Sequence, residues 1–570
     1  MQMITATISP DSRLKISVKA LPACRWLFLF ILLLTVPLAA ADNFYQQVQE
    51  GEFEGIHSGG RCGFPVILQI QQQQNPAVLE QLNHYRGSQQ VSQDSILSPS
   101  GHFMIHFDTT GSLAIPLYDR NSDGFPDYLQ FVGQAFDRAW QLEVDSLGFR
   151  PPPDLQGSPL SVYPVFCQPL GNLYGSTEFY WEDDIPVLPG LNFPSRIVLN
   201  TAFPFVGYPN VQDPVVRDSM AIAVTAAHEF NHALQLGYRI WEPLEFWFIE
   251  SSATYMEEVV APQVNDYLYY LNTYFRGTDK PLNTSFNEII DYGKVVMELM
   301  LGQQYSPAVT QEIWERIPQQ RALTALEGWL QEQGSNIPHM LADLSTWMYF
   351  TGERSRPGFY FEDAALFPPL LMYAADPLQN LPKTVLQDSL PNLSFRWYFS
   401  PVKQQNTGRF LLKPIGTGTA GDLQMVAVSG GNANISESPA GVPFNMDLAA
   451  GDTLFFAVVN SEVIENERAF TLSAQPLDST GSNEFLVFPQ PFVLSQNEPY
   501  ITFNNISGSG RIFIFTANGR PVRTLNINPG DQQIIWDLET AGGKTLAAGV
   551  YIYRLETDEL QKSGKFVVIH

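Results

Sequence analysis

The segment AVTAAHEFNHALQLGY (223–238) constrains this chain more than any other stretch of the sequence. Its two histidines, His228 and His232, stand four positions apart, and Glu229 directly follows the first. On an α-helix such positions lie on one face, so both imidazoles can reach one metal ion. The residues of the preceding turns are small and apolar, as a buried helix requires. The alternative is a helix with two hydrogen-bonded core histidines.

Zinc is the default metal for such a pair, because it accepts nitrogen and oxygen ligands in a tetrahedral site that keeps one position open. Glu229 lies beside the two histidines, where its carboxylate can take the proton of a metal-activated water. The spacing therefore predicts a zinc-dependent hydrolase with Glu229 as the general base.

The segment EFWFIESSATYMEE (245–258) supplies a third ligand for the predicted zinc. If residues 247–258 form a second helix packed on the first, Glu250 can face the two histidines. The competing acids are Glu245, Glu257 and Glu258: the first is rather close to His232 in sequence, and the other two are expected in a second shell or on the surface. We expect Glu250 to be the ligand.

Peptide hydrolysis also needs a donor for the oxyanion of the tetrahedral intermediate. The segment IIDYGKVVMELM (289–300) offers Tyr292, and Tyr255 is the alternative. A lone tyrosine on a helix is more often a packing residue than a catalytic one.

A second metal signature, DRNSDGFPDY (119–128), matches the start of an EF-hand loop. Gln130 stands at the twelfth position, where an EF-hand has an acidic ligand. The alternative is a solvated Asx-turn loop that caps a helix beginning at Pro126. The predicted structural calcium site takes oxygens from Asp119, Asn121, Asp123, Phe125 and Asp127.

Residues 1–41 have the features of a secretory signal peptide. Basic residues precede the apolar run WLFLFILLLTVPLA (26–39), and three alanines offer a cleavage site before Asp42. The alternative is an uncleaved membrane anchor, for which the run is short. We therefore expect an exported chain with no stable membrane span after cleavage.

Charge argues against nucleic acid as a partner. The formal net charge is −26, and removing the four basic residues and one acid of residues 1–41 takes it to −29. An acidic exported protein repels phosphates. Acidity also suits an extracellular protein that binds calcium.

Two cysteines, Cys62 and Cys167, remain after cleavage. In an oxidising compartment a single disulfide is the simplest interpretation, and it would close a loop of about 100 residues. An alternative comes from RCGFP (61–65), which resembles the thiolate switch that keeps some secreted metalloproteases latent by ligating their zinc.

The pattern along the chain predicts three folded units after a Gln-rich stretch, 42–100, which is an N-terminal extension or a pro-segment. Residues 101–385 place strands before helices, as in an α+β domain. Residues 386–480 alternate in short strands between turns, as in a β-sandwich, and residues 484–570 form a further β unit. We expect helices at 77–86, 126–149 and 216–238, and strands at 101–108, 160–168 and 196–203.

Residues of about 101–350 resemble a family of secreted bacterial metallopeptidases of the gluzincin type. The resemblance implies zinc ligands at His228, His232 and Glu250, with Glu229 as general base and acid. Ser251 stands where the family usually has glycine. The matching motifs, in order, are GHFMIHFDTTG (101–111), DRNSDGFPDY (119–128), AAHEFNHALQ (226–235), WFIESSATYMEE (247–258) and DYGKVVMEL (291–299).

Residues 484–570 resemble a type IX secretion sorting domain with an immunoglobulin-like fold of the FlgD type. The resemblance implies contact with the type IX secretion machinery and export across an outer membrane. A plain β-sandwich spacer or adhesion module is the alternative. The matching segments are FPQPF (488–492), which departs from the usual Y-P-N-P-F, ITF (501–503), IFTANGRPVRTL (514–525), WDLETAGGKTLAAGVYIYRL (536–555) and SGKFVVI (563–569).

Together these features predict an α+β zincin-like metallopeptidase domain followed by two all-β domains of the sandwich or immunoglobulin-like type. The expected function is that of a secreted zinc endopeptidase acting on protein or peptide substrates. The alternative is a cell-surface adhesion or glycan-binding protein with a degenerate peptidase domain.

Overall fold

The protein is described by a computed structural model. The predicted signal segment, 1–41, lies outside the described residues. These are 44–53, 56, 61–88, 92–154, 156–179, 193–285, 289–403, 406–415, 423–429, 434–464, 466–476, 485–488, 492–493, 501–504, 506–528, 531, 533–536, 538–540, 542 and 544–569.

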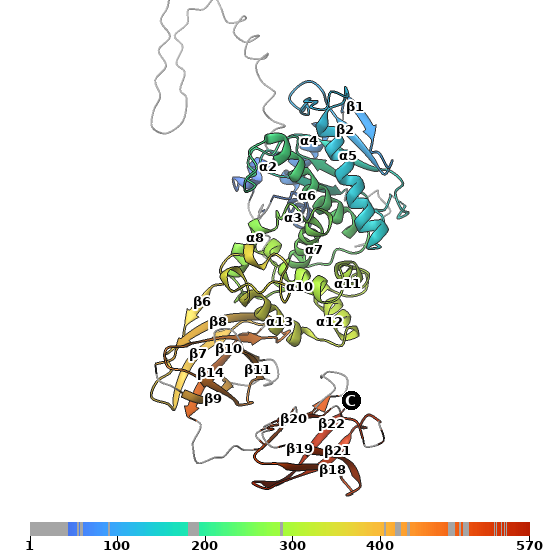
Figure 1. The fold of residues 1–570 in the computed structure, drawn as a ribbon. Coiled ribbons are helices and arrows are strands. Elements are labelled where there is room, and N and C mark those ends of the chain that lie inside the picture. Colours follow the sequence, from blue (N-terminus) through green and yellow to red (C-terminus); the bar gives the residue numbers. More distant parts are fainter. Residues whose placement is uncertain are drawn as a thin grey trace, which may run out of the picture.

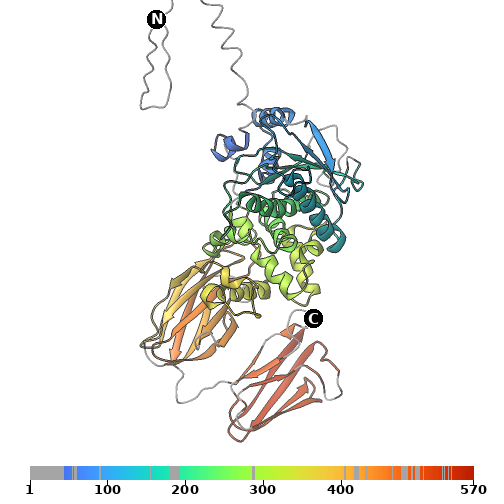
Figure 2. The same ribbon diagram turned by 45° about the horizontal axis from the view of Figure 1, so that its top comes forward.

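The described part of the chain is mixed α/β with several β-sheets (Figures 1 and 2). The first sheet has the order β1-β2-β3-β5-β4, so β4 is an edge strand. Its inner pairs, β2–β3 and β3–β5, are parallel, whereas β1 and β4 run antiparallel to their neighbours. Strands were predicted where β2, β3 and β5 lie, but not at β4. The strands are β1 (Asp94–Leu97), β2 (Phe103–Phe107), β3 (Tyr163–Cys167), β4 (Gly175–Phe179) and β5 (Ser195–Leu199).

Helices α5 (Asp127–Ala139) and α6 (Pro214–Gln235) pack on this sheet and on each other. Helix α7 (Phe246–Val260) packs on α6. A π-helical turn, η1 (Trp140–Ser146), continues α5. Asp213 caps α6 by accepting a hydrogen bond from Val215 N, and Pro214 occupies the first turn, where its missing N–H costs nothing. The predicted helices over 126–149, 216–238 and 247–258 are confirmed.

Helices also come before the first sheet and after α7. The N-terminal ones cover one side of the sheet, and the later ones lie between it and the next β unit (Figure 1). Their hydrophobic residues join one continuous core with the sheet. They are α2 (Phe44–Gln49), α3 (Phe64–Gln73), α4 (Pro76–Ser88), α8 (Leu268–Phe275), α9 (Ile289–Gly293), α10 (Val296–Gln304), α11 (Val309–Trp314), α12 (Ala322–Glu332), α13 (Ile337–Tyr349), η2 (Gly352–Arg354) and η3 (Ala364–Leu366).

Two antiparallel-rich sheets follow and enclose a second core. Helix α13 packs against β8, β10 and β13, and Trp397 Nε1 donates to Ser345 O at 3.1 Å, which ties this unit to the helical part. The orders are β11-β10-β13-β8-β6 and β12-β9-β14-β7. The strands are β6 (Met372–Ala374), β7 (Lys383–Leu390), β8 (Ser394–Pro401), β9 (Asn406–Ile415), β10 (Leu423–Ser429), β11 (Asn434–Pro439), β12 (Phe444–Leu448), β13 (Thr453–Asn460) and β14 (Arg468–Pro476).

The last strands form two further sheets around a third core, separate from the other two. Their orders are β15-β17-β20 and β16-β22-β21-β18-β19. The strands are β15 (Leu486–Phe488), β16 (Phe492–Val493), β17 (Ile501–Asn504), β18 (Gly510–Thr516), β19 (Pro521–Ile527), β20 (Gln533–Trp536), β21 (Gly549–Thr557) and β22 (Gln561–Ile569).

Candidate metal centre

Four buried side chains from distant parts of the chain meet between α6, α7 and the start of α3. They are Cys62, His228, His232 and Glu250, and one ligand atom of each lies within 4.8 Å of the others. Among the described residues, no other group of three or more His, Cys, Asp or Glu side chains is placed to hold a metal ion. The structure therefore brings the three predicted zinc ligands together and adds a thiol to them.

The two histidines and Glu250 face a common point. His228 Nε2 and His232 Nε2 lie 3.1 Å apart, and the nearest Glu250 oxygens lie 3.5 and 3.6 Å from them. Glu250 is fully buried, yet neither carboxylate oxygen has a hydrogen-bond partner in the described part of the chain. Burial raises the pKa of Glu250, but the adjacent histidines outweigh it and lower that pKa to about 2. Two imidazole nitrogens and a carboxylate that face one point without hydrogen-bonding one another's oxygens are ligands that zinc accepts, so this donor set fits a cation.

Each histidine is oriented by a hydrogen bond to its other ring nitrogen. His228 Nδ1 lies 2.8 Å from Glu257 Oε1, and His232 Nδ1 lies 2.9 Å from Gln235 Oε1. Each of these oxygens can accept a hydrogen bond from Nδ1–H, and in that tautomer the Nε2 lone pairs point to the metal position. Glu257 thus contacts the far side of the His228 ring and does not belong to the four-residue group that could hold a metal.

A series of hydrogen-bonded, buried polar side chains runs from Gln235 to the π-helical turn η1. Gln235 Nε2 donates to Asn231 Oδ1 at 2.8 Å and to Ile249 O at 3.0 Å, which links α6 to α7. Asn231 Nδ2 in turn donates to Glu143 Oε2 at 2.9 Å, on η1. Burial raises the pKa of Glu143 well above its usual value. No sequence motif pointed to this series of buried polar residues, which holds the imidazole of His232 in place.

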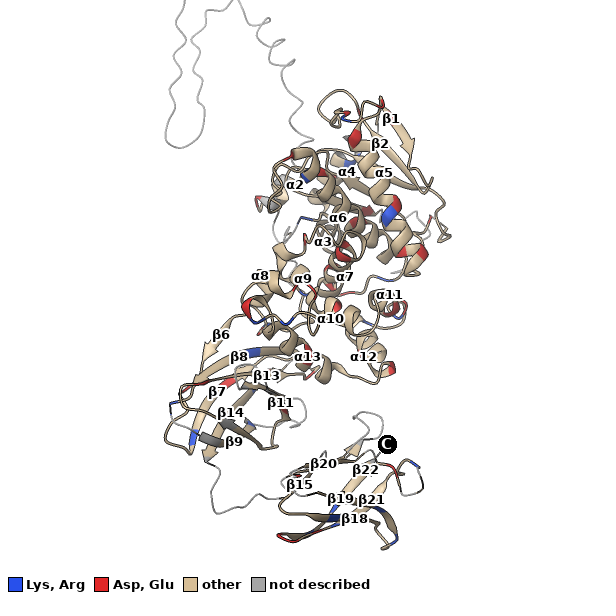
Figure 3. Cartoon of the chain, in the orientation of Figure 1, with Lys and Arg blue, Asp and Glu red and all other residues tan. Residues whose placement is uncertain are grey.

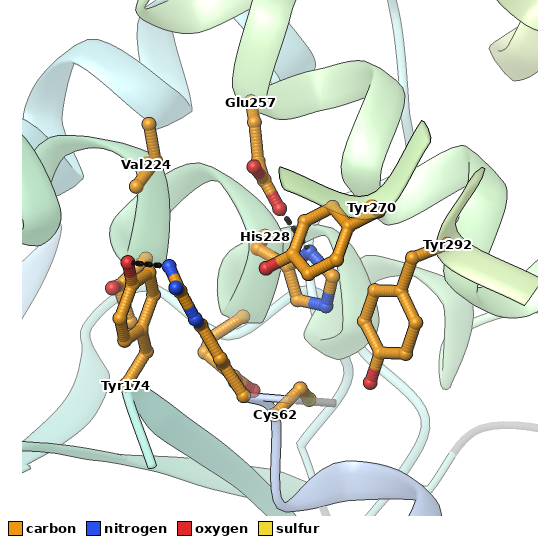
Figure 4. Close-up of a pocket in the computed structure, with 10 residues that line it drawn as sticks. Cys62, Tyr174, Val224, His228, Glu257, Tyr270 and Tyr292 are labelled. Carbon is orange, nitrogen blue, oxygen red and sulfur yellow. Dashed lines mark hydrogen bonds and ion pairs between the residues drawn. The ribbon is translucent and has the colours of Figure 1, made fainter. Parts of the chain in front are cut away.

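Glu229 lies beside the cluster and faces β4. Thr177 Oγ1 lies 2.8 Å from Glu229 Oε2, and Glu229 lines the same small pocket as Cys62, His228 and Tyr292. Figure 4 shows the last three of these residues around the pocket. The close approach of α6 to β4 depends on Gly175, because a Cβ there would lie 2.8 Å from Glu229 Cγ. The predicted general base is therefore buried next to the predicted ligands.

Tyr292, on α9, stands at the same pocket. Its ring is nearly parallel to that of His228, with centroids 5.8 Å apart and an angle of 11° between the planes. Its hydroxyl is buried and has no hydrogen-bond partner in the described residues. Burial raises the pKa of Tyr292 well above its usual value, so the hydroxyl stays protonated and can donate a hydrogen bond.

Tyr255, the alternative tyrosine, lies away from the four-residue cluster, as do the competing acids Glu245 and Glu258. Tyr255 OH donates to Pro307 O at 3.4 Å and lines a different pocket, together with Glu258. Glu245 forms an ion pair with Arg321 at 3.4 Å. Of the acidic residues on α7 (Figure 3), Glu250 alone belongs to the described four-residue cluster.

The predicted disulfide between Cys62 and Cys167 is wrong: both cysteines are free and buried. Cys167 ends strand β3, where burial raises the pKa of its thiol to about 12. Cys62 lies instead among the candidate metal ligands His228, His232 and Glu250.

In the predicted calcium loop, the side-chain oxygens bind the loop's own N–H groups. Asp119 Oδ2 accepts from Gly124 N at 2.8 Å, and Asn121 Oδ1 accepts from Asp123 N at 2.9 Å. Asp123 Oδ1 accepts from Phe125 N at 2.9 Å, and this bond lowers the pKa of Asp123. These are the bonds of an Asx-turn loop.

The end of that loop starts α5. Asp127 is the first residue of the helix, and its Oδ2 accepts from Arg120 N at 3.1 Å. The Arg120 guanidinium donates to both carboxylate oxygens of Asp213, at 2.6 and 2.8 Å, so the loop also braces the start of α6. A calcium ion in this loop stays a prediction.

Comparisons with known proteins leave the family open. No family model matches the sequence, and no curated protein matches it. Solved structures with partial likeness include PorZ, a surface component of the type IX secretion system of Porphyromonas gingivalis, at 19% identity over 18% of this chain and 14% of PorZ (TM-score 0.15). Dimeric latent PorU from the same organism is 15% identical over 33% of this chain and 20% of PorU (TM-score 0.15).

A third such structure is PliG, a periplasmic inhibitor of g-type lysozyme from Aeromonas hydrophila. It is 12% identical over 18% of this chain and 98% of PliG (TM-score 0.14). The chain spans less than a quarter of PorZ and of PorU, and TM-scores of this size carry no argument about activity. Separately, none of the helices in the described residues is long and apolar enough to span a membrane.

Proposed function

We propose that this chain is a zinc-dependent peptidase, with His228, His232 and Glu250 as metal ligands. The observation that carries the proposal is the convergence of two Nε2 atoms, 3.1 Å apart, on a fully buried carboxylate without a hydrogen-bond partner in the described residues. Two imidazoles and one carboxylate are a ligand set that zinc hydrolases use.

The chemistry of the donors favours zinc over the other abundant cations. Calcium and magnesium prefer shells made of oxygen, whereas this cluster offers two nitrogens and a sulfur beside one carboxylate. A bound zinc ion would supply a Lewis acid for a substrate carbonyl and for water.

The remaining work falls to residues of the chain. Glu229 is placed to take a proton from the attacking water at a carboxylate oxygen and to return it to the leaving amine. Thr177 holds that carboxylate by its hydroxyl at 2.8 Å. The Tyr292 hydroxyl, buried and unpaired among the described residues, can donate to the oxyanion. Glu257 and Gln235 keep the two imidazoles in place.

This arrangement favours a peptidase over an adhesion protein with a degenerate site. A site that only holds a structural metal has no use for a second buried carboxylate beside the ligands, and burying Glu229 is costly. Export to the cell surface by the type IX machinery is part of the same proposal, and it rests on the resemblance of residues 484–570 to sorting domains.

Metal content and cleavage of a peptide library test the proposal together. The full chain is expected to hold about one zinc per molecule. Glu250→Ala should lose the zinc, and Glu229→Gln should keep it while abolishing cleavage. Zinc binding indifferent to Glu250, or cleavage that survives Glu229→Gln, would contradict the assignment. Glycan binding without any hydrolysis would favour the adhesion function.

A further inference from the structure

The segment just before α3 runs along the free edge of the first sheet. Tyr174 N donates to Arg61 O at 2.7 Å, and Gly63 N donates to Gly175 O at 2.9 Å. Residues 61–63 therefore extend the sheet beyond β4, its edge strand. Adding an extended strand to a sheet edge is a common way of binding a peptide. A substrate chain that paired with β4 would need the place that this segment occupies.

Neighbouring side chains hold the segment in that place. A Cβ on Gly63 would lie 2.5 Å from Ser176 Oγ, so only glycine allows this approach to β4. Phe64 stacks on His232, with ring centroids 4.3 Å apart. Arg61 donates to the Tyr174 hydroxyl and lies 3.5 Å from the buried Asp266 carboxylate.

Between these anchors, Cys62 enters the metal centre. Its thiol is buried, and its sulfur lies within 4.8 Å of the ligand atoms of His228, His232 and Glu250. Cys62 also lines the pocket that Glu229 and Tyr292 line. Figure 4 shows Cys62 and Tyr292 at this pocket. The pocket has room for about one ordered water molecule. With Cys62 in place, little space is therefore left for a peptide carbonyl beside the candidate ligands.

We propose that Cys62 is a displaceable fourth ligand of the metal centre, and that residues 61–73 act as an internal inhibitor lying in the substrate position on β4. The structure then represents a latent form. The inhibitory role rests on the proposed peptidase function, whereas ligation of the metal by Cys62 can be tested without assuming any activity.

The neighbouring residues favour a Cys62 ligand that can be displaced over a permanent site with four protein ligands. Four protein ligands make a closed structural zinc site, whereas a catalytic site keeps one position open. A closed site would leave the buried Glu229 carboxylate and the Tyr292 hydroxyl without a role. When the segment leaves, the bond from the Cys62 sulfur to the metal breaks, the sulfur takes a proton from solvent, and water gains access to Glu229.

Cobalt substitution of the full chain tests the ligation directly. A thiolate ligand to Co²⁺ gives an intense near-ultraviolet charge-transfer band, which we expect in the wild type and in Cys167→Ser. Cys62→Ser should lose the band while keeping one Co²⁺ per molecule. A band that survives in Cys62→Ser would overturn the proposal. Loss of the metal from Cys62→Ser would equally overturn it, because Cys62 would then be a permanent structural ligand.

Thiol labelling of the wild type gives a readout that needs no substitution at Cys62. Cys62 should react slowly with a thiol reagent in the metal-loaded chain and much faster after a chelator removes the metal. Equal rates would overturn the proposal. Peptide cleavage by zinc-loaded Cys62→Ser should exceed that of the wild type by about tenfold or more, because the wild type cleaves only in its open fraction. Loss of the cobalt band in Cys62→Ser without a rise in cleavage would overturn the inhibitory role of the thiol and leave its ligation standing.

Discussion

Phe64 lies against the imidazole of His232, with ring centroids 4.3 Å apart and an angle of 28° between the planes. One residue belongs to the N-terminal segment and the other to the metal centre, and both are fully buried. Phe64 also donates its backbone N–H to the Cys62 sulfur at 3.3 Å. The position of the thiol is therefore coupled to the packing of the first residue of α3.

Truncating that ring should loosen the inhibitory segment without touching a ligand. Phe64→Ala removes a buried aromatic side chain, a change that costs about 3–5 kcal/mol. We expect faster thiol labelling of Cys62 in the metal-loaded variant than in the wild type, with metal content unchanged. Phe53→Ala, at a partly buried position of the same N-terminal region, is the control and should label like the wild type. Equal labelling rates of Phe64→Ala and the wild type would show that the packing of Phe64 does not control access to the Cys62 thiol.

Removing the charge behind His228 should weaken metal binding. Glu257→Gln keeps the size of the side chain but loses the carboxylate that lies 2.8 Å from His228 Nδ1. Partners behind a metal ligand typically contribute about 10–100-fold in affinity. Competition with a chromophoric chelator should show a loss of this size. Glu258→Gln, next in sequence but facing another pocket, is the control, and equal affinities for the two variants would contradict the role.

Periodicity was enough to predict the helices that carry the metal ligands. The i, i+4 histidines mark α6 and the apolar residues around Glu250 mark α7. That α7 packs on α6 was only a condition of the prediction, and the resemblance to gluzincins supported the choice of Glu250 as candidate ligand. The resemblance to gluzincins made Tyr292 a candidate beside Tyr255. Whether its hydroxyl has a hydrogen-bond partner could not be predicted, because that depends on the packing of α8 against α9.

The missed parts depend on contacts between distant segments. Strand β4, GSTEF, is buried on both faces, so it lacks the alternation that marks a half-buried strand. Helix α3 buries two glutamines, Gln69 and Gln71, in a stretch whose composition indicated a polar extension. The choice between a disulfide and a ligand for Cys62 required the fold, because residues 62 and 228 carry no local signal of proximity.

Adding one methyl group to β4 should disturb the approach of α6. In Gly175→Ala the new Cβ would lie 2.8 Å from Glu229 Cγ and from Thr225 Cγ2. Overpacking of this kind costs about 1–3 kcal/mol. We expect a lower melting temperature and lower peptide cleavage than in Gly207→Ala, where a Cβ meets nothing within 4 Å. Wild-type behaviour of Gly175→Ala would show that the strand and helix can separate at no cost.

Glu298, on α10, should make the stability of the folded chain depend on pH. This side chain is fully buried, accepts a hydrogen bond from Ser251 Oγ at 2.7 Å, and its other oxygen has no partner in the described residues. Burial raises the pKa of Glu298 to about 8 from an ordinary value of 4.5. Between these values the folded state holds a proton that the unfolded chain has released, so stability falls as pH rises.

Glu298→Gln should remove this dependence, because the amide keeps an acceptor for Ser251 and carries no charge at any pH. We expect the variant to melt at nearly the wild-type temperature at pH 5 and clearly above it at pH 8. Glu353→Gln, at an exposed position, is the control and should follow the wild type at both values. A difference between Glu298→Gln and wild type that is the same at pH 5 and pH 8 would mean that the Glu298 carboxyl does not change its protonation on unfolding in this range.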